Sequence, residues 1–263
     1  PKVTMLRFIC LFLLYSGAIA ELPCTLMPGK LKQLDAGNGE AYGVADNDTI
    51  YLWHANQWAR IEGRLIHVTV GPAGVWGVNK ENNIYRLNNF NWIQVSGLLK
   101  QIDAGGNKFL SGANSNDDIF CLNQDATTSP VTSLPYIHID GKLKHYACGP
   151  FGCWGVNSAN EIYYRNQVTP NACQGNSWTR VDGSLIMVEV GTDGSVFGVN
   201  ADGSVYKRVG ICPKNPRGTS WIQIDVCNSF KYVSHDSGFL WLISHNGNVF
   251  RCEYADSMLP DLL

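Results

Sequence analysis

The chain repeats one short sequence pattern six times, and this repetition constrains the fold more than any other feature. Each copy ends on an aliphatic–aromatic dipeptide that follows two short apolar segments separated by Gly or Asn turns. The dipeptides are Ile50-Tyr51, Ile84-Tyr85, Ile119-Phe120, Ile162-Tyr163, Val205-Tyr206 and Val249-Phe250. They are separated by 34, 35, 43, 43 and 44 residues. A period near 40 made of short strands and turns is typical of β-propeller blades.

One repeat, from Trp58 to Trp92, shows why each copy is expected to supply four strands. Residues 65–71 form the first strand, and a Gly-Pro-Ala-Gly turn leads to a second strand at 75–78. The third strand covers 84–86, and the outermost strand begins at Trp92. No segment carries a sustained helical period. We therefore predict an all-β fold, a six-bladed β-propeller with four antiparallel strands per blade.

The first and last repeats are incomplete in complementary ways. Cys24 stands where other repeats carry the outer-strand aromatic residue, so residues 24–27 form a fourth strand without the other three. The last repeat ends after Cys252 and has no outer strand. The simplest arrangement lets the N-terminal strand complete the last blade. A Cys24–Cys252 disulfide would then lock the ring.

The remaining cysteines suggest three further disulfides. Cys148 and Cys153 flank the turn of one hairpin, and Cys212 and Cys227 flank an outer loop and its strand. This leaves Cys121 to pair with Cys173, on outer parts of neighbouring blades. Eight cysteines allow roughly a hundred connectivities, so these pairs are geometric hypotheses. No paired Cys-x-x-Cys motif indicates a zinc site.

The N-terminus indicates the compartment. Residues 5–20 combine one basic residue, an apolar run and a small-residue Ala-Ile-Ala ending, which is typical of a secretory signal peptide. We expect residues 1–20 to be upstream residues and leader, and residues 21–263 to be a single propeller domain. Nine cysteines minus Cys10 of the leader give an even number, as expected for a secreted, extracellular protein. Asn47 begins an N-glycosylation sequon, Asn-Asp-Thr.

Charge limits the classes of partner. The chain has 20 Lys and Arg against 22 Asp and Glu, so bulk charge does not favour nucleic acid or an anionic membrane. The apolar run of the leader is too short for a membrane anchor, and we expect no membrane insertion.

The recurring Trp-x-x-Val-x-Gly-x-Leu, Val-Trp-Gly-Val-Asn and Ile-Tyr-Arg blocks resemble tectonin repeats. With the leader and the cysteines, the whole chain after residue 20 resembles the fish egg lectins of that family. The resemblance implies a six-bladed propeller that binds sugars such as N-acetylglucosamine on microbial surfaces, including bacterial lipopolysaccharide, in defence of eggs or body fluids. A homodimer of rings is compatible with it.

Candidate sugar-binding residues fall into two groups. An aromatic side chain near a rim can stack on a sugar ring, which makes Trp76 and Trp154 candidates, although packing is the more common role. Polar turn residues that differ between repeats are the other group: Asn38, Glu40, Asn107, Lys108, Asp193, His235 and Asp236. We assign the outer-strand aromatics to packing, and we expect Asn79, Asn114, Asn157 and Asn200 to hold turns.

Two other functions stay open. A structural egg or matrix protein would bind other proteins through the same surface. A propeller glycoside hydrolase would take its two catalytic carboxylates from different blades. No sequence motif of an enzyme is present, and we expect no enzymatic activity. No cofactor is indicated with certainty: the sequence has no EF-hand spacing, although loop carboxylates could hold calcium.

Overall fold

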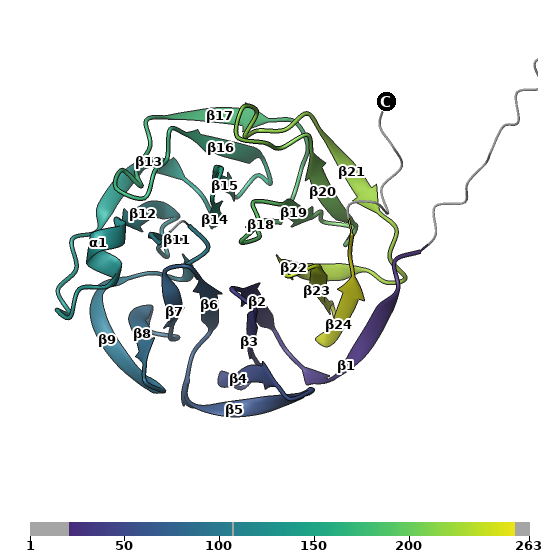
Figure 1. Cartoon of the computed structure of the whole chain (residues 1–263), viewed down its shortest axis with the longest axis horizontal. Coiled ribbons are helices and arrows are strands. Elements are labelled where there is room, and N and C mark those ends of the chain that lie inside the picture. Colours follow the sequence, from purple (N-terminus) through teal and green to yellow (C-terminus); the bar gives the residue numbers. More distant parts are fainter. Residues whose placement is uncertain (1–20, 107, 256–263) are drawn as a thin grey trace, which may run out of the picture.

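The computed structural model describes residues 21–106 and 108–255, which form six four-stranded antiparallel sheets arranged in a ring (Figure 1). Each sheet is one blade, with its innermost strand at the central axis and its outermost strand at the rim. The predicted six-bladed propeller is confirmed. The leader proposed at residues 1–20 lies outside the described residues. No helix in the described part of the chain is long and apolar enough to cross a membrane.

Blades 1 to 3 follow one another along the chain. Blade 1 contains β2 (Gln33–Gly37), β3 (Glu40–Val44), β4 (Thr49–His54) and β5 (Gln57–Arg64). Blade 2 contains β6 (His67–Gly71), β7 (Gly74–Val78), β8 (Asn83–Asn88) and β9 (Asn91–Leu98). Blade 3 contains β10 (Gln101–Asp103), β11 (Leu110–Ala113), β12 (Asp118–Leu122) and β13 (Ile137–Lys142). The short helix α1 (Gln124–Thr127) lies in the loop before β13.

Blades 4 to 6 complete the ring. Blade 4 contains β14 (His145–Gly149), β15 (Gly152–Val156), β16 (Ile162–Asn166) and β17 (Ser177–Val181). Blade 5 contains β18 (Met187–Val190), β19 (Val196–Val199), β20 (Val205–Val209) and β21 (Ser220–Ile224). Blade 6 contains β22 (Phe230–Asp236), β23 (Phe239–Ser244), β24 (Asn248–Glu253) and, as its outer strand, β1 (Cys24–Lys30).

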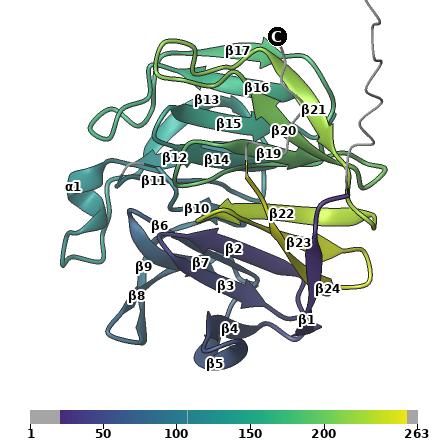
Figure 2. The same cartoon turned by 45° about the vertical axis from the view of Figure 1, so that its right-hand side comes forward.

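The ring closes through blade 6, as predicted. Strand β1 pairs antiparallel with β24, with Cys24 opposite Cys252 (Figure 2). The two cysteines form a disulfide that spans 228 residues of sequence. The first and last parts of the described chain are therefore joined by both backbone pairing and a covalent bond.

The core consists of six apolar layers, each lying mainly between two adjacent blades. Between blades 1 and 2, for example, Tyr42 and Ile50 pack with Leu65 and Val68. Every blade thus has a neighbour on each face. One repeat could not bury both of its faces alone, which explains why the repeats have to stack.

The Leu of the Gly-x-Leu motif and the Gly of the Trp-Gly-Val-Asn motif fit each other. A Cβ atom on Gly77 would lie 2.3 Å from Leu65 Cδ1, and one on Gly43 would lie 2.4 Å from Leu31 Cδ1. The glycine therefore leaves the space that the leucine fills. In the last repeat Leu242 replaces the glycine, and the pairing of β22 with β23 shifts register between Phe230 and Tyr232.

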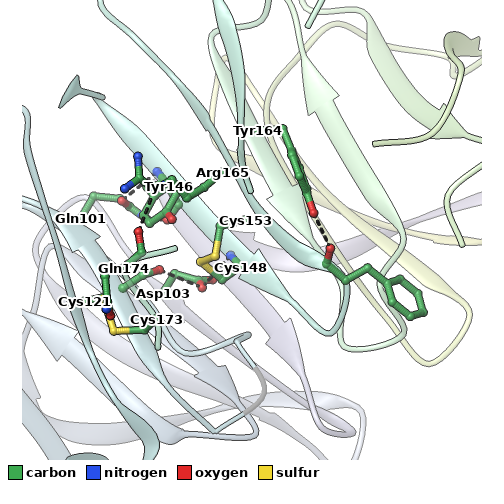
Figure 3. The surroundings of a disulfide bond; sticks show 12 residues. Gln101, Asp103, Cys121, Tyr146, Cys148, Cys153, Tyr164, Arg165, Cys173 and Gln174 are labelled. Atoms are coloured by element: carbon green, nitrogen blue, oxygen red, sulfur yellow. Dashed lines mark hydrogen bonds between the residues drawn. A yellow bond between two sulfur atoms is a disulfide. The ribbon is translucent and has the colours of Figure 1, made fainter. Parts of the chain in front are cut away.

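Glutamine side chains join neighbouring blades at the axis. Gln33 of β2 donates to the Val68 carbonyl at 2.8 Å and accepts from the Val68 N–H at 2.9 Å. Gln101 of β10 repeats this geometry with Tyr146 of β14, at 3.0 Å for both bonds (Figure 3). Each glutamine therefore acts like a short stretch of strand pairing between blades whose strands do not pair.

A second position on the innermost strands carries a side-chain oxygen that accepts a hydrogen bond from a backbone N–H of the next blade. Asp35 accepts from the Val70 N–H at 2.8 Å, and Thr69 Oγ1 accepts from the Ala104 N–H at 2.9 Å. Asp103 and Ser234 accept in the same way from the N–H groups of Cys148 and Ala36. Buried backbone N–H groups need such partners. The polar residues near the axis therefore satisfy backbone groups of the next blade.

Burial near the axis shifts the pKa values of two histidines. His67 and His145 stand where blades 1 and 3 carry Gln33 and Gln101. Desolvation is the larger cause and the nearby His145 the smaller one, and together they lower the pKa of His67 to about 3. For His145, desolvation is again the larger cause and the charge of Lys144 the smaller one, and the pKa is lowered to about 4. Both imidazoles are therefore held in the neutral form in the folded protein.

Two further disulfides form as the sequence suggested, Cys121–Cys173 and Cys148–Cys153 (Figure 3). The predicted Cys212–Cys227 pair is wrong, because both are free and exposed in this structure. Cys212 lies in the loop before β21 and Cys227 lies beyond its other end. A strand advances about 3.3 Å per residue. A disulfide requires the two Cα atoms to lie within about 7 Å of each other. The five residues of β21 separate the two cysteines by more than this.

Replacing Cys24 by Ser should destabilise the fold more than replacing Cys148. The Cys24–Cys252 disulfide closes a span of 228 residues, and Cys148–Cys153 closes a span of 5. In the chain-entropy model this difference corresponds to about 3 kcal/mol. Thermal unfolding should show a fall in Tm that is several degrees larger for Cys24→Ser. Equal shifts for the two variants would contradict the closing role of the first bond.

Replacing His67 and His145 by Gln should make the fold less sensitive to acid. Unfolded histidine has a pKa of about 6.5, so below that pH the unfolded state binds protons that the folded state does not. The neutral histidines therefore add stability above pH ~6.5, and this is lost as the pH falls towards ~4. Protonation of Asp35, Asp103 and Glu189, whose pKa values burial raises, opposes this loss.

Urea unfolding at pH ~7 and pH ~5 measures the effect. The double variant should lose less stability between the two pH values than the wild type does, and exposed His54→Gln should behave like the wild type. Gln fits the site because blades 1 and 3 already carry it. The same loss of stability in all three proteins would show that these imidazoles do not set the acid response.

Candidate functional site

Grooves where neighbouring blades meet are a recurring surface feature of the ring. At each junction a three-residue connector leads from the outer strand of one blade to the innermost strand of the next; it begins with Gly at five junctions and with Asn228 between blades 5 and 6. In the first five repeats the connector reaches the outer-strand aromatic residue of the following blade. Grooves lie at the junctions between blades 4 and 5, between blades 6 and 1, and between blades 5 and 6.

The groove between blades 4 and 5, here groove 4/5, has a volume of about 170 Å³. It is lined by Ile162, Gly183, Ser184, Leu185, Asn200, Tyr206 and Trp221. Trp221 Nε1 donates to the Asp182 carbonyl at 3.0 Å, which fixes the indole against the connector. The side chain of Asn200 accepts from the Ser204 N–H at 2.8 Å. The groove therefore presents the fixed indole of Trp221 and the ring of Tyr206 beside an amide and a hydroxyl group.

The connector glycine makes room for the aromatic ring. Gly183 has a φ of +115° and Gly63 a φ of +109°, values that side chains rarely adopt. A Cβ on Gly63 would lie 3.0 Å from Trp92, and one on Gly183 would lie 3.4 Å from Trp221. Gly29, Gly97 and Gly141 have the same relation to Trp58, Tyr136 and Trp178. The recurring aromatic and Gly of the repeat thus form one wall and the floor of a groove.

The groove between blades 6 and 1, here groove 6/1, has a volume of about 320 Å³. It is lined by Pro28, Gly29, Lys30, Leu31, Tyr51, Gln57 and Trp58. Trp58 packs against Trp53 and Trp241, with ring centroids 5.1 Å and 6.0 Å away. Trp53, which stands outside the repeat pattern, is thereby explained as a packing residue that supports the groove wall.

The groove between blades 5 and 6, here groove 5/6, lacks the indole wall. It encloses about 280 Å³ between Asn228 and Ser229 of the connector and Ser244, His245, Asn246, Asn248 and Phe250 of blade 6. The outer-strand aromatic position is Cys24, which is bonded to Cys252. Ring closure has therefore replaced the stacking residue at this junction.

Two predicted stacking residues are part of the core instead. Trp76 is 0% exposed and Trp154 is 1% exposed. Trp76 Nε1 donates to the Ala73 carbonyl at 2.8 Å, so its polar atom is also satisfied inside the protein. A sugar cannot stack on a ring that has no free face. The prediction that these two residues contact sugar is therefore wrong in this structure.

The structure brings Asp193, His235 and Asp236 together at one mouth of the ring. His235 Nδ1 lies 3.6 Å from Asp193 Oδ1. The Asp236 carboxylate accepts from the Gly39 N–H at 2.8 Å and also from the Thr192 hydroxyl group. Partial burial raises the pKa of Asp193, but the nearby His235 and the hydrogen bonds from Ser195 lower it more, so it stays below its usual value. This cluster joins blades 5, 6 and 1.

Other predicted turn residues lie around the same mouth. Asn38 and Glu40 are exposed in and beside the β2–β3 turn, one residue either side of Gly39. Lys108 is exposed between β10 and β11, and its carbonyl accepts from Thr127. Asn107 lies outside the described residues. This mouth is at the opposite end of the second strands from the Asn turn that lines groove 4/5, so the predicted polar residues and the grooves are separate surfaces.

The outer-strand aromatics are the residues whose exposure the sequence reasoning missed. Trp58, Trp92, Tyr136, Trp178 and Trp221 are all half-buried, so they pack and also leave part of their surface at the junctions. The connector Gly that each one contacts lies 29 to 39 residues earlier in the chain, a spacing too variable to serve as a sequence signal. The expected role of the Asn residues is confirmed: Asn79 and Asn157, for example, accept backbone N–H groups across their turns.

Residues 21–106 and 108–255 contain no group of three His, Cys, Asp or Glu side chains placed to hold a metal ion. The buried carboxyls of Asp35, Asp103 and Glu189 do influence one another. Burial raises the pKa of Asp103 and Glu189 well above the usual value, and the charge of Asp35 raises both further. Protonation of these carboxyls lowers the cost of burying them together.

Comparison with known proteins gives a family and a close relative. A model of the tectonin domain matches residues 30–245. The fish-egg lectin of Cyprinus carpio is 45% identical over 238 residues, which cover 89% of this chain and the whole of the carp protein.

Solved structures resemble the chain in fold alone. A protein of unknown function from Bacteroides thetaiotaomicron has a TM-score of 0.57 at 14% identity, covering 88% of this chain and 72% of its own. Human WBSCR16 has a TM-score of 0.55 at 11% identity, covering 86% of this chain and 76% of its own. Identities this low carry the propeller architecture and nothing about ligands.

Replacing Gly63 by Ala should destabilise the fold more than replacing Gly39 by Ala. Both glycines have positive φ, so both variants carry backbone strain of about 1–2 kcal/mol. Only Gly63 has an aromatic ring at 3.0 Å from the added Cβ, whereas Gly39 has no atom within 4 Å. Chemical denaturation should show an extra loss of about 1 kcal/mol or more for Gly63→Ala. Equal losses would mean that the Trp92 ring moves aside freely.

Proposed function

Because the chain belongs to the tectonin family, we propose that it is a secreted lectin whose blade-junction grooves bind N-acetylglucosamine-type sugars of microbial surface glycans. The relative in carp is a fish-egg lectin, which supports carbohydrate binding as the general role. The proposed setting is innate defence in eggs or body fluids, with lipopolysaccharide among the bacterial targets.

Groove 4/5 is the observation that carries the proposal. A pyranose has an apolar face and a ring of hydroxyl groups, so a site needs an aromatic surface beside hydrogen-bonding groups. Tyr206 and Trp221 supply the surface, and Asn200 and Ser184 supply polar groups at its edge. Hydrogen bonds hold Trp221 and Asn200 in place before any ligand arrives. Such preorganisation lowers the entropy cost of binding.

Each groove is shallow, and binding to one sugar should be weak. An exposed hydrogen bond exchanges for water and returns about 1 kcal/mol or less, so an affinity near millimolar is expected for a monosaccharide. Several grooves on one rigid ring, or on a dimer of rings, can engage a dense glycan surface together. Linked sites raise apparent affinity by roughly a hundredfold or more. Repetition of the blade is therefore what makes weak sites useful.

Ser184→Tyr should weaken binding to a surface coated with N-acetylglucosamine-terminated glycan. Ser184 is exposed and lines groove 4/5, so a larger side chain fills the groove without entering the core. Thr25→Tyr, on the exposed outer strand β1 and away from the groove linings, is the matched control. We expect a severalfold loss for Ser184→Tyr, none for the control, and an unchanged Tm for both.

The same assay separates the other functions. Free sugar should compete with the wild-type protein only at millimolar concentrations, and multivalent glycan should compete far more strongly. Failure to bind any microbial or animal glycan would reject the lectin function and favour a structural protein. Turnover of a chromogenic glycoside would indicate a hydrolase.

A further inference from the structure

We propose that groove 6/1 is a separate subsite for acidic sugars, in which Lys30 pairs with a carboxylate or phosphate group while the sugar ring lies against Tyr51 and Trp58. This inference rests on the proposed lectin function and adds a ligand class to it. It follows from one repeated position that lines the grooves and differs in charge between them.

That position is the second residue of the connector, which follows a Gly in five connectors and Asn228 in the connector between blades 5 and 6. Its occupants around the ring, starting from groove 6/1, are Lys30, Arg64, Leu98, Lys142, Ser184 and Ser229. Lys30, Ser184 and Ser229 line the three grooves described above. Among these three, groove 6/1 is the one whose lining residues include a lysine or arginine.

The charge of Lys30 is not neutralised within the described residues, in contrast to that of Lys142. Lys142 is paired across the sheet with Asp118, and the two form a salt bridge. Lys30 is paired at the same place with the neutral residue Asn248, and its side chain makes no hydrogen bond or ion pair in the part of the chain that the structure describes. The nearby carboxylate of Asp48 is bound to Lys32.

The rest of groove 6/1 is arranged to hold the lysine chain and a ring. Gly247 of blade 6 gives the aliphatic chain of Lys30 a surface to lie on, because a Cβ there would be 3.5 Å from Lys30 Cβ. Trp58 is fixed by Trp53 and Trp241. Its Nε1 is buried and, like that of Trp92, has no acceptor in the described part of the chain, whereas Trp178 and Trp221 donate at the same position to the carbonyls of Asp140 and Asp182. Gln57 adds an amide group to the groove lining.

An unpaired ammonium beside aromatic rings selects an anion attached to an apolar ring face. Lysine is a compact point charge with three donors, so carboxylate and phosphate are both suitable partners. Uronic acids and sugar phosphates share this chemistry. A neutral hexose could accept a hydrogen bond from Lys30 but would form no ion pair with it. Because the pair is exposed to solvent, its contribution is limited to about a fivefold gain in affinity, and it should fall with added salt.

Three variants test the inference: Lys30→Gln removes the charge, Asn248→Asp places a carboxylate opposite Lys30 as Asp118 lies opposite Lys142, and Lys142→Gln is the control. The probes are multivalent glycans that end in glucuronic acid, in glucose 6-phosphate or in neutral N-acetylglucosamine. Binding is measured on coated surfaces in about 50 mM and about 500 mM NaCl. All four proteins should have similar Tm values, because the changed side chains are exposed or half-buried at the surface.

We expect Lys30→Gln and Asn248→Asp to lose about fivefold in binding to at least one acidic probe at low salt, and Lys30→Gln to bind the neutral probe like the wild type. Lys142→Gln should behave like the wild type on all three probes. The two acidic probes distinguish a carboxylate from a phosphate ligand. The inference is overturned if the wild type and Lys30→Gln bind both acidic probes equally. If the wild type does not bind the neutral probe at all, the proposed lectin function itself is rejected.

Discussion

Burial between blades is the constraint on which the rest of this structure depends. Each blade is apolar on both faces, and in the described residues no strand of one blade pairs with a strand of the next. Side-chain packing and side chain–backbone hydrogen bonds therefore have to hold the blades together. An open array would leave two apolar faces in water, so the ring has to close. Sharing blade 6 between β1 and β24 closes it with strand pairing, and Cys24–Cys252 makes the closure covalent.

The candidate sites are a consequence of the same packing. A connector must cross from each blade to the next, and its Gly allows the following aromatic ring to lie directly against it. The ring covers the apolar layer with one part of its surface and faces the groove with another. Trp221 is an example, because it belongs to the packing around the core between blades 4 and 5 and also lines groove 4/5. Packing and ligand contact are therefore two roles of one residue.

The sequence predicts features that repeat or that follow from chain geometry, and these include the blades, the closing strand and the Asn turns. It fails where the answer depends on which face a side chain takes. Trp76 and Trp154 lie on the second strands of their blades, and only the stacking of blades shows that their rings are enclosed. The Cys212–Cys227 prediction counted residues along the chain without the length of β21 between them. The grooves were missed because each combines residues from two repeats.

The second residue of the connector explains how one fold can present different chemistry at each junction. Lys30, Arg64, Leu98, Lys142, Ser184 and Ser229 are all exposed. Substitutions at such positions change stability by about 0.5 kcal/mol or less, so their identity is not fixed by the fold. A large apolar residue that fills the junction follows each of them, and a Gly that contacts an aromatic ring precedes all of them except Ser229, which follows Asn228. Variation is therefore confined to the groove edge, where it changes charge and hydrogen bonding without altering the propeller.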